Sequence, residues 1–228
     1  FSKYANKIFV NFDKEYLSIN KYKNKILIVG LPERDTKKKY TFEKRKNDKL
    51  INFLIFAGSQ GSVDVLKIFN KIVIELKKIP QLKQINFIIQ CPLEKQNEIK
   101  KLLNSYNLEF EIKSFFNNFD DILYKTNIAL CRSGAGTIND LVNYRIPAII
   151  LPLPSAKDNH QFENAKILKN IGCAIIVDKK SIEIDKIILF IKKVLDDKDF
   201  NDRIKDNYSK IKRYNTNELM WMSIQNDQ

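Results

Sequence analysis

The sequence is poor in the residues that build disulfide frameworks and metal sites. Its 228 residues include three cysteines and a single histidine, His160. The cysteines are widely spaced, odd in number and form no CxxC motif, which favours reduced thiols in the core of a cytoplasmic protein. One histidine cannot build a histidine-rich metal site. We therefore expect neither a disulfide framework nor a bound metal.

Long apolar runs are absent as well. No run approaches the ~18–20 residues that span a bilayer, and no secretory signal is visible. We also find no internal repeat. The chain is nevertheless 44% hydrophobic and 11% aromatic, which is ample for a large core. Its length suggests one domain with part of a second.

Basic residues are in clear excess. The net charge is +13, from 40 Lys and Arg against 27 Asp and Glu. Such an excess can favour nucleic acid or an anionic membrane. The lysines are scattered, however, and we interpret most of them as solvated surface. The densest basic cluster, residues 36–46, is interpreted as a flexible linker. No RNA-binding aromatic motif or recognition-helix signature supports nucleic-acid binding.

From residue 50 onward, short apolar runs alternate with amphipathic segments. This alternation predicts an α/β fold with a parallel sheet and helices on both faces. Two short strands, 8–10 and 26–29, are predicted before it. The strands predicted in the main domain are 53–56, 85–89, 110–112, 128–130, 148–151 and 174–177. The predicted helices are 62–78, 94–105, 120–125, 137–144, 161–171, 184–195, 200–212 and 217–225.

The most informative segment is 131–140, Cys-Arg-Ser-Gly-Ala-Gly-Thr-Ile-Asn-Asp. It joins a predicted strand to a predicted helix through a turn of small residues. The start of a helix carries partial positive charge and backbone N–H groups without partners, which suit a phosphate. Asp140 would lie about one helical turn further on, where a carboxylate can accept hydrogen bonds from a ribose. The segment indicates a nucleotide site, although such turns also occur as plain connections.

Two further segments strengthen this interpretation. Residues 57–62, Ala-Gly-Ser-Gln-Gly-Ser, form a second Gly-rich turn between a strand and a helix. Two such turns can face one crevice at the carboxyl edge of a parallel sheet. Residues 152–165 gather polar side chains at another strand–helix connection. There Asp158 or Asn159 can cap the helix, and His160 and Gln161 suit the hydroxyl groups of a sugar.

In order and spacing, these motifs resemble the C-terminal, donor-binding domain of the MurG family of N-acetylglucosaminyltransferases. The family's Cys-Arg-Ser-Gly-Ala-x-Thr motif with its acidic residue is found at 131–140, and its Asp-Asn-His-Gln-x-x-Asn-Ala motif at 158–165. Its Gly-Gly-Ser-Gln-Gly-Ala motif corresponds to 57–62, and Gly-Asn-Pro-Val-Arg corresponds more weakly to 30–34. The resemblance covers essentially the whole chain.

The resemblance implies a GT-B fold, in which two Rossmann-like domains face each other across a cleft. This chain would be the C-terminal domain. Residues 1–35 would be the residual end of the N-terminal acceptor domain, 36–49 a Lys-rich linker and 50–212 the UDP-sugar-binding domain. Residues 213–228 would form a C-terminal helix that can pack back on the N-terminal domain.

The resemblance also assigns expected contacts to individual residues. The uracil would lie against backbone groups of Phe116, and Asp140 would bind the ribose hydroxyls. His160 and Gln161 would contact the N-acetylglucosamine. The residues expected at the diphosphate are Arg34, Ser59, Gln60, Ser133, Gly134, Ala135, Gly136 and Thr137.

The sequence departs from the family pattern at several positions. Asp140 is shorter than the usual Glu, Ala57 replaces a Gly, Gly136 replaces a larger apolar residue, and Leu31 replaces an Asn. The family's N-terminal Gly-rich loop with its His is missing. Because that half binds the acceptor and is expected to supply acid–base chemistry, we expect this chain to bind donor without transferring it.

The resemblance implies transfer of N-acetylglucosamine from UDP-GlcNAc to a lipid-linked muramoyl-pentapeptide in peptidoglycan synthesis. The reaction would need no cofactor, and the enzyme would be cytoplasmic and peripheral on the inner leaflet of the cell membrane. Two alternatives stay open: a donor-binding subunit of a two-chain UDP-GlcNAc transferase, and a non-catalytic nucleotide-binding module. Residues 1–35 argue against the two-chain enzyme, because they look like part of a larger domain.

Overall fold

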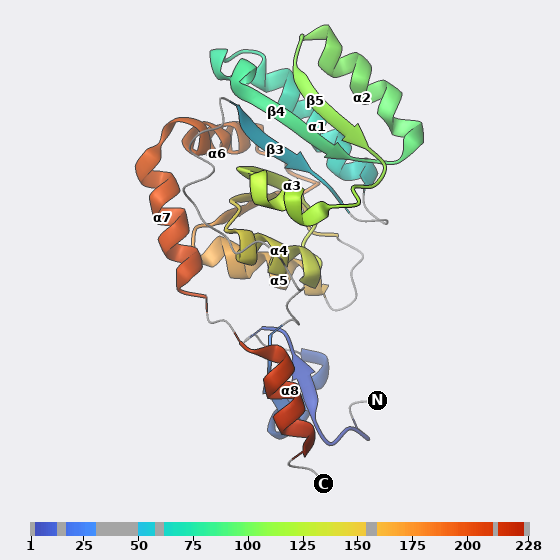
Figure 1. The fold of residues 1–228 in the computed structure, drawn as a ribbon, viewed down its shortest axis with the longest axis vertical. Coiled ribbons are helices and arrows are strands. Elements are labelled where there is room, and N and C mark those ends of the chain that lie inside the picture. Colours follow the sequence, from blue (N-terminus) through green and yellow to red (C-terminus); the bar gives the residue numbers. More distant parts are fainter. Residues whose placement is uncertain are drawn as a thin grey trace.

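The main body of the molecule is a parallel sheet covered by helices (Figure 1). The computed structural model describes residues 3–12, 17–30, 50–57, 62–153, 159–211 and 214–225. The strands of this body are β3 (Ile51–Ile55), β4 (Ile85–Gln90), β5 (Glu109–Lys113), β6 (Ile128–Cys131), β7 (Ala148–Ile150) and β8 (Ala174–Ile176). Its α-helices are α1 (Ser62–Leu76), α2 (Leu93–Ser105), α3 (Phe119–Lys125), α4 (Ala135–Tyr144), α5 (His160–Asn170), α6 (Ile184–Asp196) and α7 (Lys198–Ser209).

The six strands lie in the order β5-β4-β3-β6-β7-β8, and all neighbours are parallel. Within this sheet, the chain enters in the middle at β3 and continues outward through β4 and β5. It then crosses back to β6, on the other side of β3, and continues outward through β7 and β8. The direction of growth reverses between β3 and β6. In open α/β sheets, ligands bind outside the carboxyl ends of the strands at such a reversal.

Alternating side chains of the central strands divide the core between the two faces of the sheet. Phe53 and Ile55 of β3 pack into one core cluster, whereas Leu54 packs into the other. This alternation is the period of two that a β-strand imposes. Helices α1, α2 and α6 cover the first cluster, and α3, α4, α5 and α7 cover the second. Each large apolar side chain buried in this way contributes about 1.5–3 kcal/mol, so both faces need their helices.

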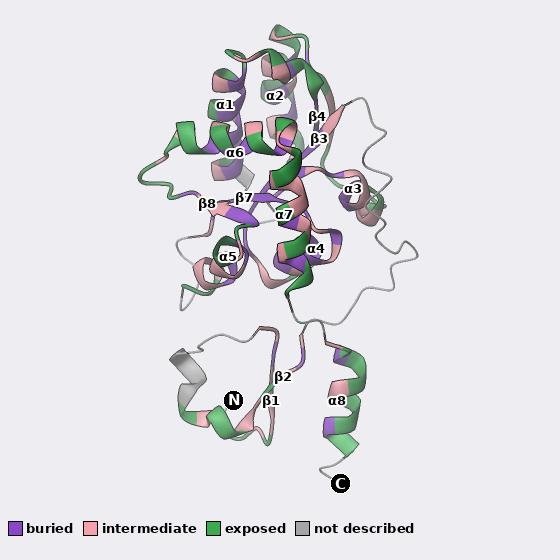
Figure 2. Cartoon of the chain, turned by 90° about the vertical axis from the view of Figure 1, so that its left-hand side faces the viewer, coloured by how far each residue is buried: buried purple, intermediate pink, exposed green. Residues whose placement is uncertain are grey.

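A smaller unit lies at one end of the molecule, apart from the main sheet (Figures 1 and 2). It contains the parallel strands β1 (Ile8–Val10) and β2 (Ile26–Ile28), joined through the 3₁₀ helix η1 (Leu17–Lys25). The C-terminal helix α8 (Thr216–Gln225) lies beside them. The Nζ atom of Lys7 donates to the backbone oxygen of Ser223 in α8, at 2.6 Å.

A glycine marks the point where residues 214–216 cross the end of β2. Gly30 has a φ of +77°, and a Cβ placed on it would lie 3.1 Å from Oγ1 of Thr216 and 3.2 Å from Cβ of Tyr214. Only glycine adopts this backbone conformation without strain and leaves this space. The Thr216 hydroxyl also donates to the backbone oxygen of Val29, at 2.6 Å. The backbone after β2 is therefore packed against the start of α8.

The predicted strands and helices are all found, and their ends differ from the prediction by at most three residues. The 3₁₀ helices η1 and η3 (Pro80–Gln84) were not predicted, because they have no apolar periodicity. The predicted linker, 36–49, lies outside the described residues. Within the described ranges, no helix has the length and apolar character that crossing a bilayer requires.

Candidate functional site

The turn after β6 leads directly into α4 on one side of the reversal point. Gly134 is the N-cap residue, with extended backbone angles (φ −58°, ψ 153°), and no described side chain caps this helix start. A Cβ placed on Gly136 would meet none of the described atoms within 4 Å, so the space there is open. The first backbone N–H groups of α4 can therefore donate to an anion. This is the geometry that the sequence predicted for a phosphate.

Ser133, in contrast, turns its side chain into the protein. It is fully buried, and its hydroxyl donates to the backbone oxygen of Gln161 at 2.7 Å. Its own backbone oxygen accepts from Nδ2 of Asn164, at 3.0 Å. The Ser133 side chain thus holds the start of α4 against the start of α5. A contact from Ser133 to a phosphate would have to come from its backbone.

Arg132 joins three connections at the carboxyl edge of the sheet. It is only 5% exposed. Its Nη1 atom donates to the backbone oxygens of Leu151, at 2.9 Å, and Pro152, at 3.1 Å, both in the segment after β7. Its Nη2 atom lies 3.2 Å from Oδ2 of Asp64, in the first turn of α1. A buried charge needs such partners. The sequence did not predict this role of Arg132, because any residue type can supply the backbone oxygens that it contacts.

The carboxylate of Asp64 is shared between two cations. Its other oxygen, Oδ1, lies 2.8 Å from Nζ of Lys179. The hydrogen bond from Lys179 is the largest cause that holds the pKa of Asp64 below its usual value of 3.8. Partial burial opposes this shift, and the contact with Arg132 supports it. The carboxylate is therefore charged at neutral pH.

Asp140, the predicted ribose ligand, is largely covered by protein. It is 7% exposed and lies in the middle of α4. It is close enough to Cys131, at the end of β6, that its negative charge adds to the effect of burial in raising the pKa of that thiol. The carboxylate is thus near Cys131, which precedes the turn predicted to bind a phosphate. Contact with a ribose stays a prediction.

At the start of α5, side chains are available to a ligand. His160 is exposed and Gln161 is partly buried. The Oε1 atom of Gln161 accepts from the backbone N–H of Leu153, at 3.0 Å, which leaves its NH₂ group as the part that can turn to a sugar. Asn159 occupies the N-cap position with a φ of 53°, but its side chain makes no capping hydrogen bond. The alternative cap, Asp158, lies outside the described residues.

Phe116, the predicted uracil contact, lies in the segment after β5. Its ring is 4% exposed and packs into the second core cluster, with Nζ of Lys113 at 5.4 Å from the ring centroid. A buried ring fixes the backbone at this position, which is the part that the resemblance assigns to the uracil. The contact itself stays a prediction. The remaining predicted diphosphate ligands, Arg34, Ser59 and Gln60, lie outside the described residues.

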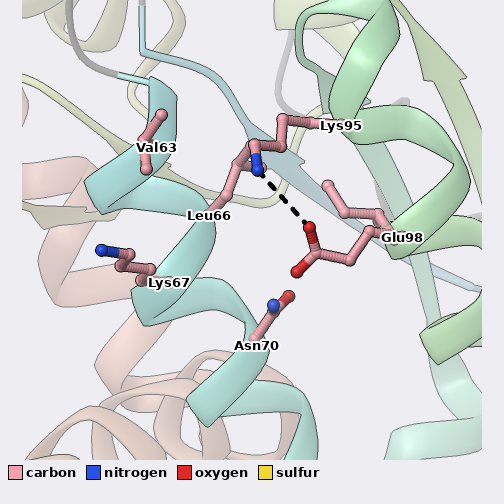
Figure 3. A pocket seen from close by; sticks show the side chains of 7 residues that line it. Val63, Leu66, Lys67, Asn70, Lys95 and Glu98 are labelled. Carbon is pink, nitrogen blue, oxygen red and sulfur yellow. Dashed lines mark ion pairs between the residues drawn. The ribbon is translucent and has the colours of Figure 1, made fainter.

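Neither a metal site nor the small pocket between α1 and α2 corresponds to the predicted nucleotide site. Among the described residues, no group of three or more His, Cys, Asp or Glu side chains could hold a metal ion. A pocket of about 60 Å³ lies between α1 and α2 (Figure 3), well below the roughly 300–1,000 Å³ of sites that enclose a small molecule. Its lining residues are Val63, Leu66, Lys67, Asn70, Lys95, Glu98 and Ile99.

Comparison with known proteins gives a consistent result. The sequence is 32% identical over 222 residues to the UDP-N-acetylglucosamine--N-acetylmuramyl-(pentapeptide) pyrophosphoryl-undecaprenol N-acetylglucosamine transferase of Rickettsia bellii. The alignment covers 90% of this chain and 60% of that protein, so the chain spans about 60% of the length of this curated relative. This finding confirms the resemblance to the MurG family.

Solved structures show the same fold. MurG of Acinetobacter baumannii matches with a TM-score of 0.67 at 23% identity, over 81% of this chain and 52% of that chain. The spinosyn rhamnosyltransferase SpnG, complexed with thymidine diphosphate, matches with a TM-score of 0.55 at 18% identity, over 77% of this chain and 46% of that chain. These likenesses confirm the predicted fold class, the C-terminal domain of a GT-B glycosyltransferase.

The match to a family description is the most direct of the findings. Residues 52–219, which include β4 to α7 and the start of α8, match the glycosyltransferase family 28 C-terminal domain. This range is well over half of the chain. The chain therefore belongs to the glycosyltransferase family 28 C-terminal domain family.

Proposed function

We propose that this chain is the donor-binding half of an enzyme that transfers N-acetylglucosamine from UDP-GlcNAc to a lipid-linked muramoyl-pentapeptide. The observation that carries the proposal is the uncapped start of α4 at the point where the strand order reverses. The Rickettsia bellii relative is named for a reaction with these substrates. The SpnG structure, which holds thymidine diphosphate, supports a nucleoside diphosphate as ligand for this fold.

The chemistry follows from charge. In an inverting transfer, the acceptor hydroxyl attacks the anomeric carbon of the sugar, the bond to the diphosphate breaks, and UDP leaves with the bonding electrons. Negative charge grows on the departing diphosphate. Backbone N–H groups fixed at a helix start stabilise such charge, and each donor of this kind is worth about 3 kcal/mol in comparable sites. With Arg34 as an added cation, we propose that no metal or other cofactor takes part.

The other contacts with the donor substrate form part of the proposal. Asp140 would bind the ribose and backbone groups of Phe116 the uracil, while His160 and Gln161 would contact the sugar. We propose Ser59 and Gln60 as further diphosphate ligands.

The small unit at the end of the molecule suggests where the acceptor half belongs. A parallel pair of strands is marginal by itself, and parallel sheets need cover on both faces. Helix α8 exposes Trp221, Met222 and Ile224, by 62%, 52% and 49%. We propose that β1, β2 and α8 complete the N-terminal acceptor domain of the whole protein. That protein would be cytoplasmic and peripheral on the inner leaflet of the membrane.

Calorimetry with UDP and several UDP-sugars tests the proposal. We expect UDP to bind and UDP-GlcNAc to bind more tightly than other UDP-sugars, with little dependence on salt. Affinity for nucleic acid would instead fall steeply with salt. We expect no transfer by this chain and expect transfer once a relative's acceptor half is added. Failure to bind UDP would overturn the proposal.

A further inference from the structure

Asp64 is held by cations from two other connections of the sheet. It lies in the first turn of α1, directly after the segment that follows β3. Its Oδ2 atom is 3.2 Å from Nη2 of Arg132, in the turn after β6, and its Oδ1 atom is 2.8 Å from Nζ of Lys179, in the turn after β8. One carboxylate therefore joins three connections that all begin at carboxyl ends of strands.

The backbone that carries Lys179 is fixed by a closed turn. Asp178 and Ser181 form an antiparallel bridge, and the backbone N–H of Ser181 donates to the backbone oxygen of Asp178 at 3.2 Å. The Asp178 carboxylate also accepts from the backbone N–H of Lys180, at 2.9 Å. Because this turn is closed, Lys179 reaches Asp64 from a defined position, although its own side chain is half exposed.

The charges in this group have a direct bearing on an anion bound nearby. A carboxylate in the first turn of a helix stabilises that helix, but it also repels an anion at the same helix end. Here one negative charge lies between the two positive charges of Arg132 and Lys179. The carboxylate can therefore tie the connections together without making the edge of the sheet negative.

We propose that Asp64 and Lys179 are positioning residues for the donor diphosphate: Asp64 fixes the start of α1 relative to the start of α4, and Lys179 offsets its charge. This inference rests on the proposed function, because it concerns the same donor. It also differs from a purely electrostatic role. Asp64→Asn removes a negative charge, which by charge alone would strengthen diphosphate binding, whereas loss of positioning weakens it.

The test measures UDP binding by calorimetry and uridine binding by NMR titration, since uridine lacks the diphosphate. We expect Asp64→Asn to raise the Kd for UDP roughly tenfold and to leave the Kd for uridine unchanged. Asp64→Glu, which keeps the charge, should recover most of the affinity. Lys179→Gln should raise the Kd for UDP about threefold at low salt.

Lys186→Gln is the matched control. It removes the same charge from α6, where Nζ of Lys186 pairs with Oε1 of Glu183 at 2.6 Å between two well-exposed side chains. Its Kd for UDP should equal that of the unsubstituted chain. A similar loss in Lys186→Gln and Lys179→Gln would overturn the role of Lys179, because general surface charge would then explain both.

The remaining outcomes are decisive. Tighter or unchanged UDP binding by folded Asp64→Asn would overturn the positioning role, and so would an equal loss for UDP and uridine. If circular dichroism shows that Asp64→Asn does not fold, the exposed variant Lys179→Gln decides, and unchanged UDP affinity at low salt overturns the inference. If the unsubstituted chain binds no UDP, the proposed function fails as well. If it binds UDP and Asp64→Asn binds equally, only this inference fails.

Discussion

Helices α4 and α5 pack against each other and start at the same edge of the sheet, but their first turns present different groups. At α4, the side chains of Arg132 and Ser133 are buried and the backbone N–H groups remain for a ligand. At α5, the exposed His160 and the partly buried Gln161 present side chains. Backbone groups suit a phosphate, which every nucleotide donor shares, whereas side chains can distinguish one sugar from another. The start of α4 should decide whether a nucleotide binds, and the start of α5 should decide which sugar it carries.

The largest expected effect comes from Arg132→Met. The substitution removes the donors to Leu151 and Pro152 and one cation from Asp64, so we expect the free energy of unfolding to fall by about 3 kcal/mol. Urea denaturation followed by circular dichroism measures it. Arg203→Met on the exposed side of α7 is the control, and surface changes of this kind stay within about 0.5 kcal/mol. A loss for Arg132→Met as small as that of the control would refute its structural importance.

The next largest effect concerns ligand binding at α4. Asp140→Ala should weaken UDP binding by roughly 1–3 kcal/mol, because a charged hydrogen-bond acceptor for the ribose is lost. UDP-GlcNAc should lose the same amount, since both ligands share the ribose. Calorimetry provides both values, and circular dichroism must show that the buried position tolerates alanine. An unchanged Kd would remove Asp140 from the site.

These first two predictions separate what the sequence could show from what it could not. The alternation of apolar runs predicted the parallel sheet, and the small residues around Gly134 predicted an open helix start, because both depend on local properties of the chain. Apart from the contact of Arg132 with Asp64, the side chains of Arg132 and Ser133 donate to backbone oxygens 19 to 28 residues away, supplied by Leu151, Pro152 and Gln161. Any residue type offers such an oxygen, so no sequence pattern could have revealed these contacts.

A smaller and more selective effect is expected at the start of α5. Gln161→Ala should weaken UDP-GlcNAc binding by about 1 kcal/mol, the value of one neutral hydrogen bond, and leave UDP nearly unaffected. Gln161→Glu is the matched variant, because it keeps an acceptor for the N–H of Leu153 but removes the NH₂ donors. Both variants should lose the sugar contribution. Equal losses for UDP and UDP-GlcNAc would instead assign Gln161 to holding the segment after β7.

The smallest effect distinguishes two contacts made just before α4. One is the ion pair of Arg132 with Asp64, and the other is the neutral hydrogen bond from Ser133 to Gln161. Asp64 has a pKa below its usual value of 3.8 in the folded protein, so its stabilisation is complete above that value and is lost as the pH falls through the lowered pKa. The difference in unfolding free energy between the unsubstituted chain and Asp64→Asn should therefore be constant from about pH 7 to 5 and shrink below about pH 4. We expect it to be about 1 kcal/mol at most, because Lys179 is half exposed.

The bond from Ser133 to Gln161 joins two neutral groups, so the difference for Ser133→Ala should not change with pH. Urea titrations of the three proteins from pH 7 to 3 measure both differences. If the two differences follow the same course with pH, the charge on Asp64 is not what ties α1 to α4.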